Sequence, residues 1–256
     1  MLFEFGQTDQ NKAFFDRHPK FYPAFERLMD LANKCFGRTS GAKDHAQDIC
    51  FSLGHTCRDD YTEILFLVVN GYGTGASKLL RGLYERAVTL AYIAKHPEKV
   101  DKFLHFAAIQ EYRAMKSALK IVTEEQFNEA FGAARTVAKI TELYQRFKPE
   151  FPGRAISWDV SLISMAEDVG DPYDKYYLGS YTIPNLHVHA TYASAFDGTP
   201  EKVRAERNIQ NADFALLNAT ACLLFTMREQ NNVFDLGLND ELETCEKDVV
   251  DVFVTR

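Results

Sequence analysis

The sequence has few of the features that mark strands, membrane spans or secreted folds. Its longest apolar run, residues 64–69, is far shorter than the roughly 20 residues needed to cross a bilayer. Residues 1–7 lack the basic segment and long apolar stretch of a signal peptide. No Asn-Gly or Asp-Gly pair lies between alternating apolar segments, so no hairpin is predicted. These absences favour a cytoplasmic, all-α protein without membrane contact.

Cysteine is scarce, with five in the chain and no pair at CxxC spacing. Cys50 and Cys57 lie seven residues apart, which is two helical turns and too far for a disulfide. Their spacings from His45 and His55 do not bring four zinc ligands to one helix face. We therefore expect reduced core thiols, as is usual in the cytosol, and no zinc site there.

The chain carries more acidic than basic residues: 36 Asp and Glu against 29 Lys and Arg, for a net charge of −7. Because such a chain repels phosphate on average, we expect no double-stranded DNA partner, although a local basic site could still hold RNA or a small anion. With 256 residues, 46% of them hydrophobic, it can bury a sizeable core. We expect a single domain over residues 1–256.

Apolar residues recur at helical spacing along most of the chain. The expected helices cover residues 19–35, 42–70, 76–95, 97–121, 123–147, 201–231 and 240–252. Residues 148–199 differ, since they hold four prolines and many aromatics and predict short helices at most. The sequence thus predicts a helical bundle of five or more long helices with one irregular connection. Long irregular segments in compact domains are often functional.

Arg81 and Glu85 lie four residues apart on one face of the expected helix 76–95. A surface ion pair with arginine before glutamate adds only a few tenths of a kcal/mol to the stability of a helix. Val88 and Tyr92 on the same face, with Tyr84 beside it, indicate partial burial. Both a structural ion pair and a pair within a binding site are compatible with this pattern.

Two histidines one residue apart, His187 and His189, lie within the irregular connection. In an extended segment they would share a face, and in a helix they would diverge by roughly 200°. A histidine beside an arginine can transfer protons and hold a phosphate. Metal binding completed by Glu85 is an alternative, but no HExxH or paired ExxH motif supports it, so no metal ligand is assigned.

Other side chains could extend such a site. Tyr84 lies beside Glu85, and His105 falls in the middle of the expected helix 97–121. The apolar neighbours of His105 favour a core histidine, and a contribution to the site is the alternative. Five tyrosines of the connection could stack a ring, but packing onto the bundle is the favoured interpretation; they are Tyr173, Tyr176, Tyr177, Tyr181 and Tyr192.

Two stretches of the chain resemble a bacterial helical family catalogued as a domain of unknown function. Its members carry an Arg-x-x-x-Glu helix, here residues 81–85, and a Tyr…Ser…His-small-Ser/Thr segment, here residues 176–191. The resemblance covers roughly residues 45–230 and implies that His189 is the family histidine, with Asn185 where the family has serine. It implies no established activity or cofactor. A fainter similarity to helical RNase domains of toxin and abortive-infection systems implies phosphate-ester or RNA cleavage, in phage defence.

Two interpretations of the chain follow. In the first, Arg81 clamps an anion, His189 is the general acid or base and Glu85 orients it, with Tyr84, His187 and His105 as further ligand contacts. In the second, the same three residues form a buried structural clamp in a non-catalytic interaction or regulatory module. The sequence leaves open whether the protein is an enzyme, which cofactor it takes and whether it forms a homo-oligomer.

Overall fold

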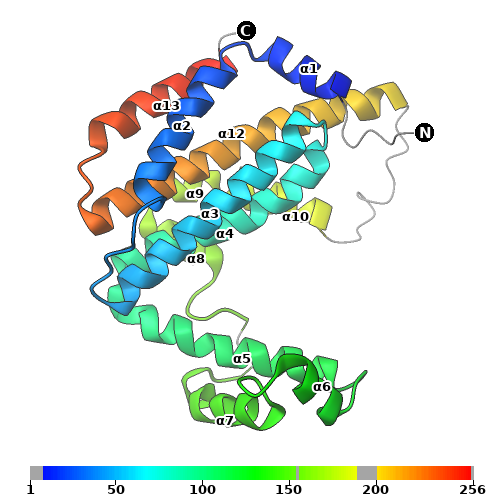
Figure 1. Ribbon diagram of the computed structural model, residues 1–256, viewed down its shortest axis with the longest axis vertical. Helices are drawn as coiled ribbons and strands as arrows, with labels where there is room; N and C mark the ends of the chain where they lie inside the picture. Colours follow the sequence, from blue (N-terminus) through cyan, green and yellow to red (C-terminus); the bar gives the residue numbers. More distant parts are fainter. Residues whose placement is uncertain (1–7, 154–155, 189–200, 255–256) are drawn as a thin grey trace. The chain divides into compact units, whose positions relative to one another are not determined.

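The computed structural model describes residues 8–153, 156–188 and 201–254; in the last range it describes the side chains of 209 and 211–253. These residues form helices and no strand, which confirms the all-α class (Figure 1). None of the helices so described is long and apolar enough to span a membrane. The chain divides into two compact units, residues 1–95 with 162–256, and residues 96–161. The single domain expected from the sequence stays a prediction.

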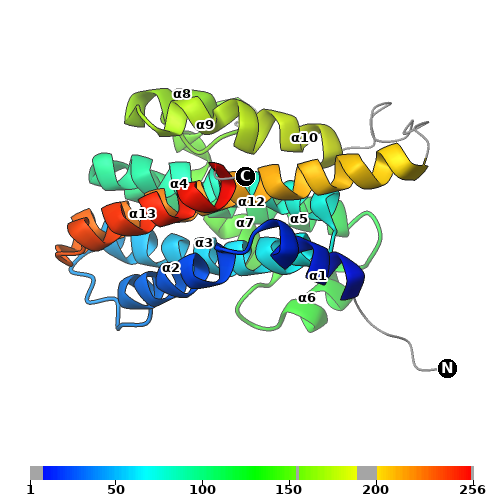
Figure 2. The same ribbon diagram turned by 90° about the horizontal axis from the view of Figure 1, so that it is seen from above.

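The first unit contains the long helices of the bundle. Its elements are α1 (Thr8–Arg17), α2 (Phe21–Phe36), α3 (His45–Val69), α4 (Gly73–Lys95), α8 (Leu162–Val169), α9 (Tyr173–Tyr177), the π-helical turn η3 (Leu178–Thr182), α10 (Ile183–Val188), α12 (Glu201–Phe234) and α13 (Asn239–Val254). Figure 2 shows α8, α9 and α10 on one side of α4 and α12, and α2 and α3 on the other.

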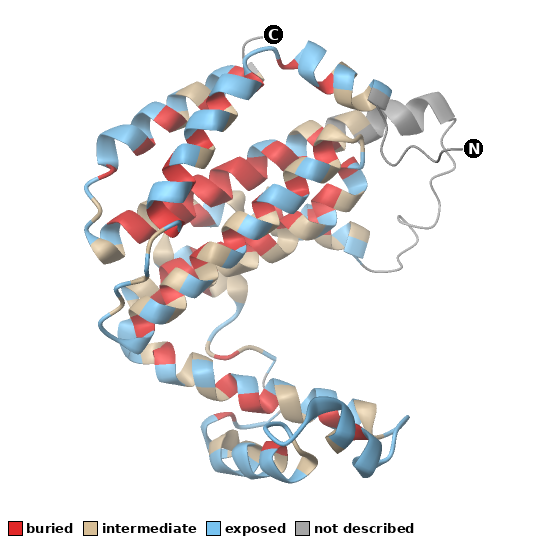
Figure 3. Ribbon diagram, viewed as in Figure 1, coloured by how far each residue is buried: buried red, intermediate tan, exposed pale blue. Residues whose placement is uncertain are grey.

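The core of this unit lies where α3, α4 and α12 pack together, and Figure 3 shows buried positions along the middle of α12. Gly54 of α3 permits this approach, because a Cβ there would come within 2.6 Å of a Phe36 ring carbon and 2.8 Å of the Gln230 side-chain nitrogen. Gln230 is fully buried and donates from Nε2 to the Cys50 carbonyl at 2.7 Å. One glycine and one amide thus fix the α3–α12 contact.

The second unit is built on one long helix. Its elements are η1 (Pro97–Lys99), α5 (Val100–Ala118), α6 (Glu124–Phe131), α7 (Val137–Phe147) and η2 (Lys148–Glu150). Met115, Phe127 and Ile140 form a small core that joins α5, α6 and α7. The rings of Tyr112 and Tyr144 stack 3.8 Å apart beside it.

The prediction of one continuous helix over residues 123–147 is wrong. The capping box at Thr123 and Gln126 is present, but α6 ends at Phe131. Gly132 then takes a φ of 73°, a left-handed conformation that ends the helix. Thr136 caps α7 by accepting a hydrogen bond from the Lys139 amide, so the segment folds as a helical hairpin.

The other expected helices lie within a few residues of the observed ones, and the long helices predicted are present. The structure adds α1, which had not been predicted. Within the irregular connection, residues 162–188 form a succession of short helices. Those short helices pack against α4 and bring Tyr181 to Arg81.

Candidate functional site

Arg81 is the centre of a polar cluster formed by α4 and η3. Its Nη2 donates to Glu85 Oε1 at 3.2 Å and to the Tyr181 hydroxyl at 3.4 Å. The guanidinium carbon lies 5.1 Å from the centroid of the Tyr181 ring, a cation–π distance. Burial opposes the charge, but the hydrogen bonds to Tyr181 and Glu85 outweigh it and raise the pKa of Arg81. The cation is therefore fixed in place and permanently charged.

The cluster is neither sealed nor fully open to solvent. The side chains of Arg81 and Glu85 are 26% and 41% exposed. An ion pair at this exposure contributes at most a few tenths of a kcal/mol to folding. A contribution to folding stability therefore does little to explain why Arg81 and Glu85 are paired.

Two side-chain polar atoms, one on α4 and one on α10, lack a hydrogen-bond partner among the described residues. They are the Nε of Arg81 on α4 and the Oδ1 of Asn185 on α10, and both are buried. These two helices pack against each other. An orphaned donor and an orphaned acceptor each cost about 1–3 kcal/mol, so a bound group that satisfies either one would be stabilised.

Tyr84 lies beneath this cluster and is fully buried. Its hydroxyl donates to the Tyr173 carbonyl at 2.7 Å, which ties α4 to α9. Its ring lies edge-on to Tyr177 at 6.2 Å and tilted to Tyr181 at 6.5 Å. Burial also raises the pKa of the phenol. This hydroxyl is therefore occupied by the protein, although Tyr84 positions the ring that holds Arg81.

The predicted histidines fall in three different situations. His189 lies outside the described residues. His187 lies near the end of α10 with intermediate exposure. His105 belongs to the second unit, where it stacks on Phe147 at 3.9 Å and approaches Glu150 through Nδ1 at 2.9 Å. The participation of all three in an Arg81 site stays a prediction.

In the part of the chain that the structure describes, no three His, Cys, Asp or Glu side chains gather in a group that could hold a metal ion. The five cysteines are buried and unpaired, as expected. Burial raises the pKa of each thiol, so they are poor nucleophiles; Cys50, for example, reaches about 12.

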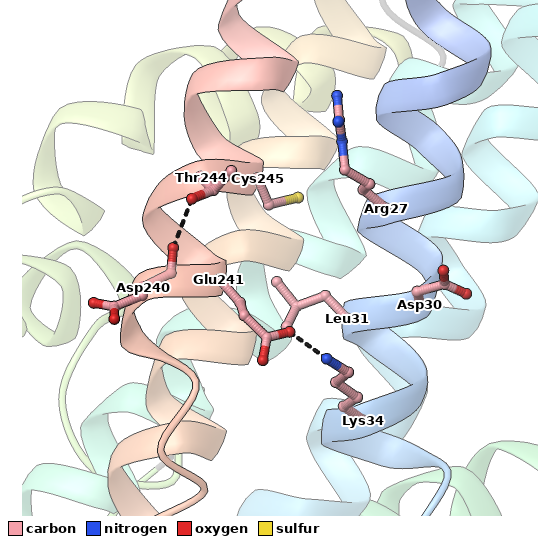
Figure 4. Close-up of a pocket in the computed structure, with 8 residues that line it drawn as sticks. All are labelled: Arg27, Asp30, Leu31, Lys34, Asp240, Glu241, Thr244 and Cys245. Carbon is pink, nitrogen blue, oxygen red and sulfur yellow. Dashed lines mark hydrogen bonds and ion pairs between the residues drawn. The ribbon is translucent and has the colours of Figure 1, made fainter.

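A groove of about 360 Å³ lies between α2 and α13 (Figure 4). Lys34 pairs with Glu241 across it, and Arg27 pairs with Asp248 at 2.9 Å. Because these basic side chains are matched by acidic ones, the groove is a charged seam between the two helices.

Glu229 of α12 is a residue that the sequence did not reveal. It lies in a groove of about 350 Å³ lined by parts of α4, α8 and α12. The Tyr173 hydroxyl donates to its Oε1 at 3.4 Å. Burial raises the pKa of this carboxyl, and the hydrogen bond from Tyr173 offsets only part of the rise. No sequence motif surrounds Glu229. Its burial becomes visible only in the folded structure, where it lies between packed helices.

Comparison with known proteins adds a family and no activity. Residues 47–199 match the model of a family described as a family of unknown function (DUF5677). The chain belongs to this family. No curated protein and no solved structure matches it. The matched range holds Arg81, Glu85 and the short helices α8 to α10, so the cluster lies inside the family's common region.

Proposed function

We propose that the protein binds a small ligand with an anionic oxygen, such as a phosphate ester, at Arg81. The observation that carries this proposal is the buried, unpaired Nε of Arg81 in a guanidinium already fixed by Glu85 and Tyr181. A buried donor without a partner is costly, so a ligand oxygen that accepts from it would relieve that cost. An O–H or N–H of the same ligand would satisfy the orphaned Oδ1 of Asn185.

The test is isothermal titration calorimetry with inorganic phosphate. Arg81→Lys keeps the positive charge but lacks the Nε–H, so it should weaken phosphate binding by about tenfold. Arg86→Lys is the matched control, because Arg86 lies on the same helix and pairs with Asp60 at 2.5 Å. Equal affinities in the wild type and Arg81→Lys would contradict the proposal.

A catalytic extension assigns His189 as the general acid or base, Glu85 as its orienting partner and Arg81 as the anion clamp. The reaction would be cleavage of a phosphate ester or RNA. Incubation with single-stranded RNA should give products for the wild type and none for His189→Ala. Unchanged cleavage by the variant would remove His189 from this role. A part in phage defence depends on this activity and is tested through it.

The second candidate is a non-catalytic module in which Arg81 and Glu85 clamp α4 to η3. It is favoured by the Nη2 bonds that join Glu85 of α4 and Tyr181 of η3 to one guanidinium. This module predicts that Arg81→Gln lowers the melting temperature while phosphate produces no shift in the wild type. The calorimetric titration therefore separates the two functions. The cytoplasmic location, RNA as a partner and a homo-oligomer stay predictions.

A further inference from the structure

The groove beside Glu229 is formed by matching positions on two long helices. Ala91, Ala94 and Lys95 of α4 lie at spacings of three and four residues, and so do Glu229, Asn232 and Val233 of α12. Residues at these spacings share a helix face. The small alanine side chains leave space between the helices, and Glu229, Asn232 and Val169 line the same groove.

Glu229 has a carboxyl group that no cation in the described part of the protein compensates. Among the described residues its one polar partner is the Tyr173 hydroxyl, and no basic side chain pairs with it. The nearby cation, Lys95, is engaged by Asp168: its Nζ donates to the Asp168 carbonyl and lies 3.5 Å from Oδ2 of that residue. A largely buried carboxylate without a cation is costly.

The groove is large enough to take a small cation as a ligand, and its lining is about equally polar and apolar. Its volume of about 350 Å³ lies within the range of small-molecule sites. Alanine and valine side chains supply contacts for a short hydrocarbon body, and Glu229 and Asn232 supply the polar contacts. An acidic group in a groove that also holds alanine and valine side chains fits an alkylammonium ion.

We infer that this groove binds a small organic cation, a primary amine on a short aliphatic body, with Glu229 as its counter-ion. The site is separate from the anion site. Ala91 follows Arg81 by ten residues on α4, or about 15 Å along the helix axis. If binding at one site is disproved, the proposal for the other site is therefore unaffected.

Titration with n-butylammonium chloride, followed by calorimetry and ligand-observed NMR, tests the inference. The wild type should bind it saturably with one site and should bind n-butanol at least about tenfold more weakly. Glu229→Gln keeps the shape and removes the charge, so affinity for n-butylammonium should fall by about tenfold or more. Glu243→Gln, at an exposed position of α13, is the matched control and should bind as the wild type does.

A second variant keeps the test decisive if Glu229→Gln does not fold. Ala94→Met fills the groove and leaves the carboxylate, so it should abolish binding. Affinity in the wild type should also rise with pH above the ordinary carboxyl range, because Glu229 must lose its proton to pair with the amine and burial raises its pKa. Absence of saturable binding, equal affinity for the neutral alcohol, or binding retained in a folded Glu229→Gln or Ala94→Met variant would each overturn the inference.

Discussion

The two polar regions on α4 hold charges in opposite situations. Near the middle of the helix, Arg81 has an anionic partner and an aromatic face, and its surroundings favour the charged form. Near the C-terminal end, Glu229 faces α4 without a cation, and its surroundings favour the neutral form. A compensated charge is compatible with either binding or structure, whereas a buried carboxyl without a cation either stays protonated or pairs with a cationic ligand.

Tyrosines connect the two regions. The Tyr84 ring lies beside Tyr181, which holds Arg81, and its hydroxyl bonds to the main chain of Tyr173, whose own hydroxyl reaches Glu229. The short helices α9 and η3 supply these partners. The irregular connection predicted from its prolines is therefore the element that joins both sites to the bundle.

The largest effect is expected from Tyr84→Ala. Removing this fully buried ring leaves a cavity and should cost about 3–5 kcal/mol of unfolding free energy, measured by urea denaturation. Both sites should weaken together, since both depend on the residues that Tyr84 holds. Tyr22→Ala, at a side chain that is 58% exposed, is the control and should change stability little. A mild loss for Tyr84→Ala would break the proposed connection.

Asp60 extends the comparison because it pairs with a cation, Arg86, and its pKa is nevertheless raised. Burial raises its pKa from 3.8 to about 6 although Arg86 pairs with it. A raised carboxyl pKa gives stability below pH 4 that is lost as pH rises through 6, a change of about 3 kcal/mol. Asp60→Asn should therefore remove this decline in a series of denaturation curves from pH 4 to 7. An unchanged pH profile in the variant would show that Asp60 is not the titrating group.

Tyr84→Phe isolates the hydroxyl from the ring. It leaves the Tyr173 carbonyl without this donor and should cost about 1–2 kcal/mol. We expect the loss to weaken amine binding more than phosphate binding, because the hydroxyl acts on the Tyr173 side and the ring on the Arg81 side. Calorimetry with n-butylammonium and phosphate compares the two, and equal losses would contradict separate roles.

The smallest effects should have opposite signs. Glu229→Gln removes an uncompensated charge and should raise stability at pH 7 by about 1 kcal/mol. Arg81→Gln breaks the hydrogen bonds from Nη2 to Glu85 and Tyr181 and should lower stability by a few tenths of a kcal/mol. Thermal unfolding of both variants in one buffer gives the comparison directly. Melting temperatures that shift in the same direction in both variants would contradict the difference described between the Arg81 and Glu229 regions.

Much of the fold could be predicted from the sequence because helical spacing is a local signal. The positions of α3, α4 and α12 followed from apolar periodicity, and the Thr123 capping box was visible as a motif. The break at Gly132 was missed because apolar residues continue on both sides of it. The packing of short helices on α4 could not be predicted, since it depends on contacts between distant segments.

The candidate site was predictable in part for the same reason. Arg81 and Glu85 are neighbours on one helix, so their pairing follows from spacing. Tyr181 was visible only as one of several tyrosines, and its contact with Arg81 spans a hundred residues. Glu229 has no local signal at all, because its burial arises from three helices that meet in the folded chain.

The most direct test of the anion site follows the Nε–H of Arg81 itself. In a ¹H–¹⁵N spectrum of arginine side chains, the Arg81 resonance is identified by its absence from Arg81→Lys. Addition of inorganic phosphate should shift this resonance saturably and slow its exchange with water, while the Arg86 resonance stays in place. An Arg81 resonance unchanged at saturating phosphate would contradict the proposed function.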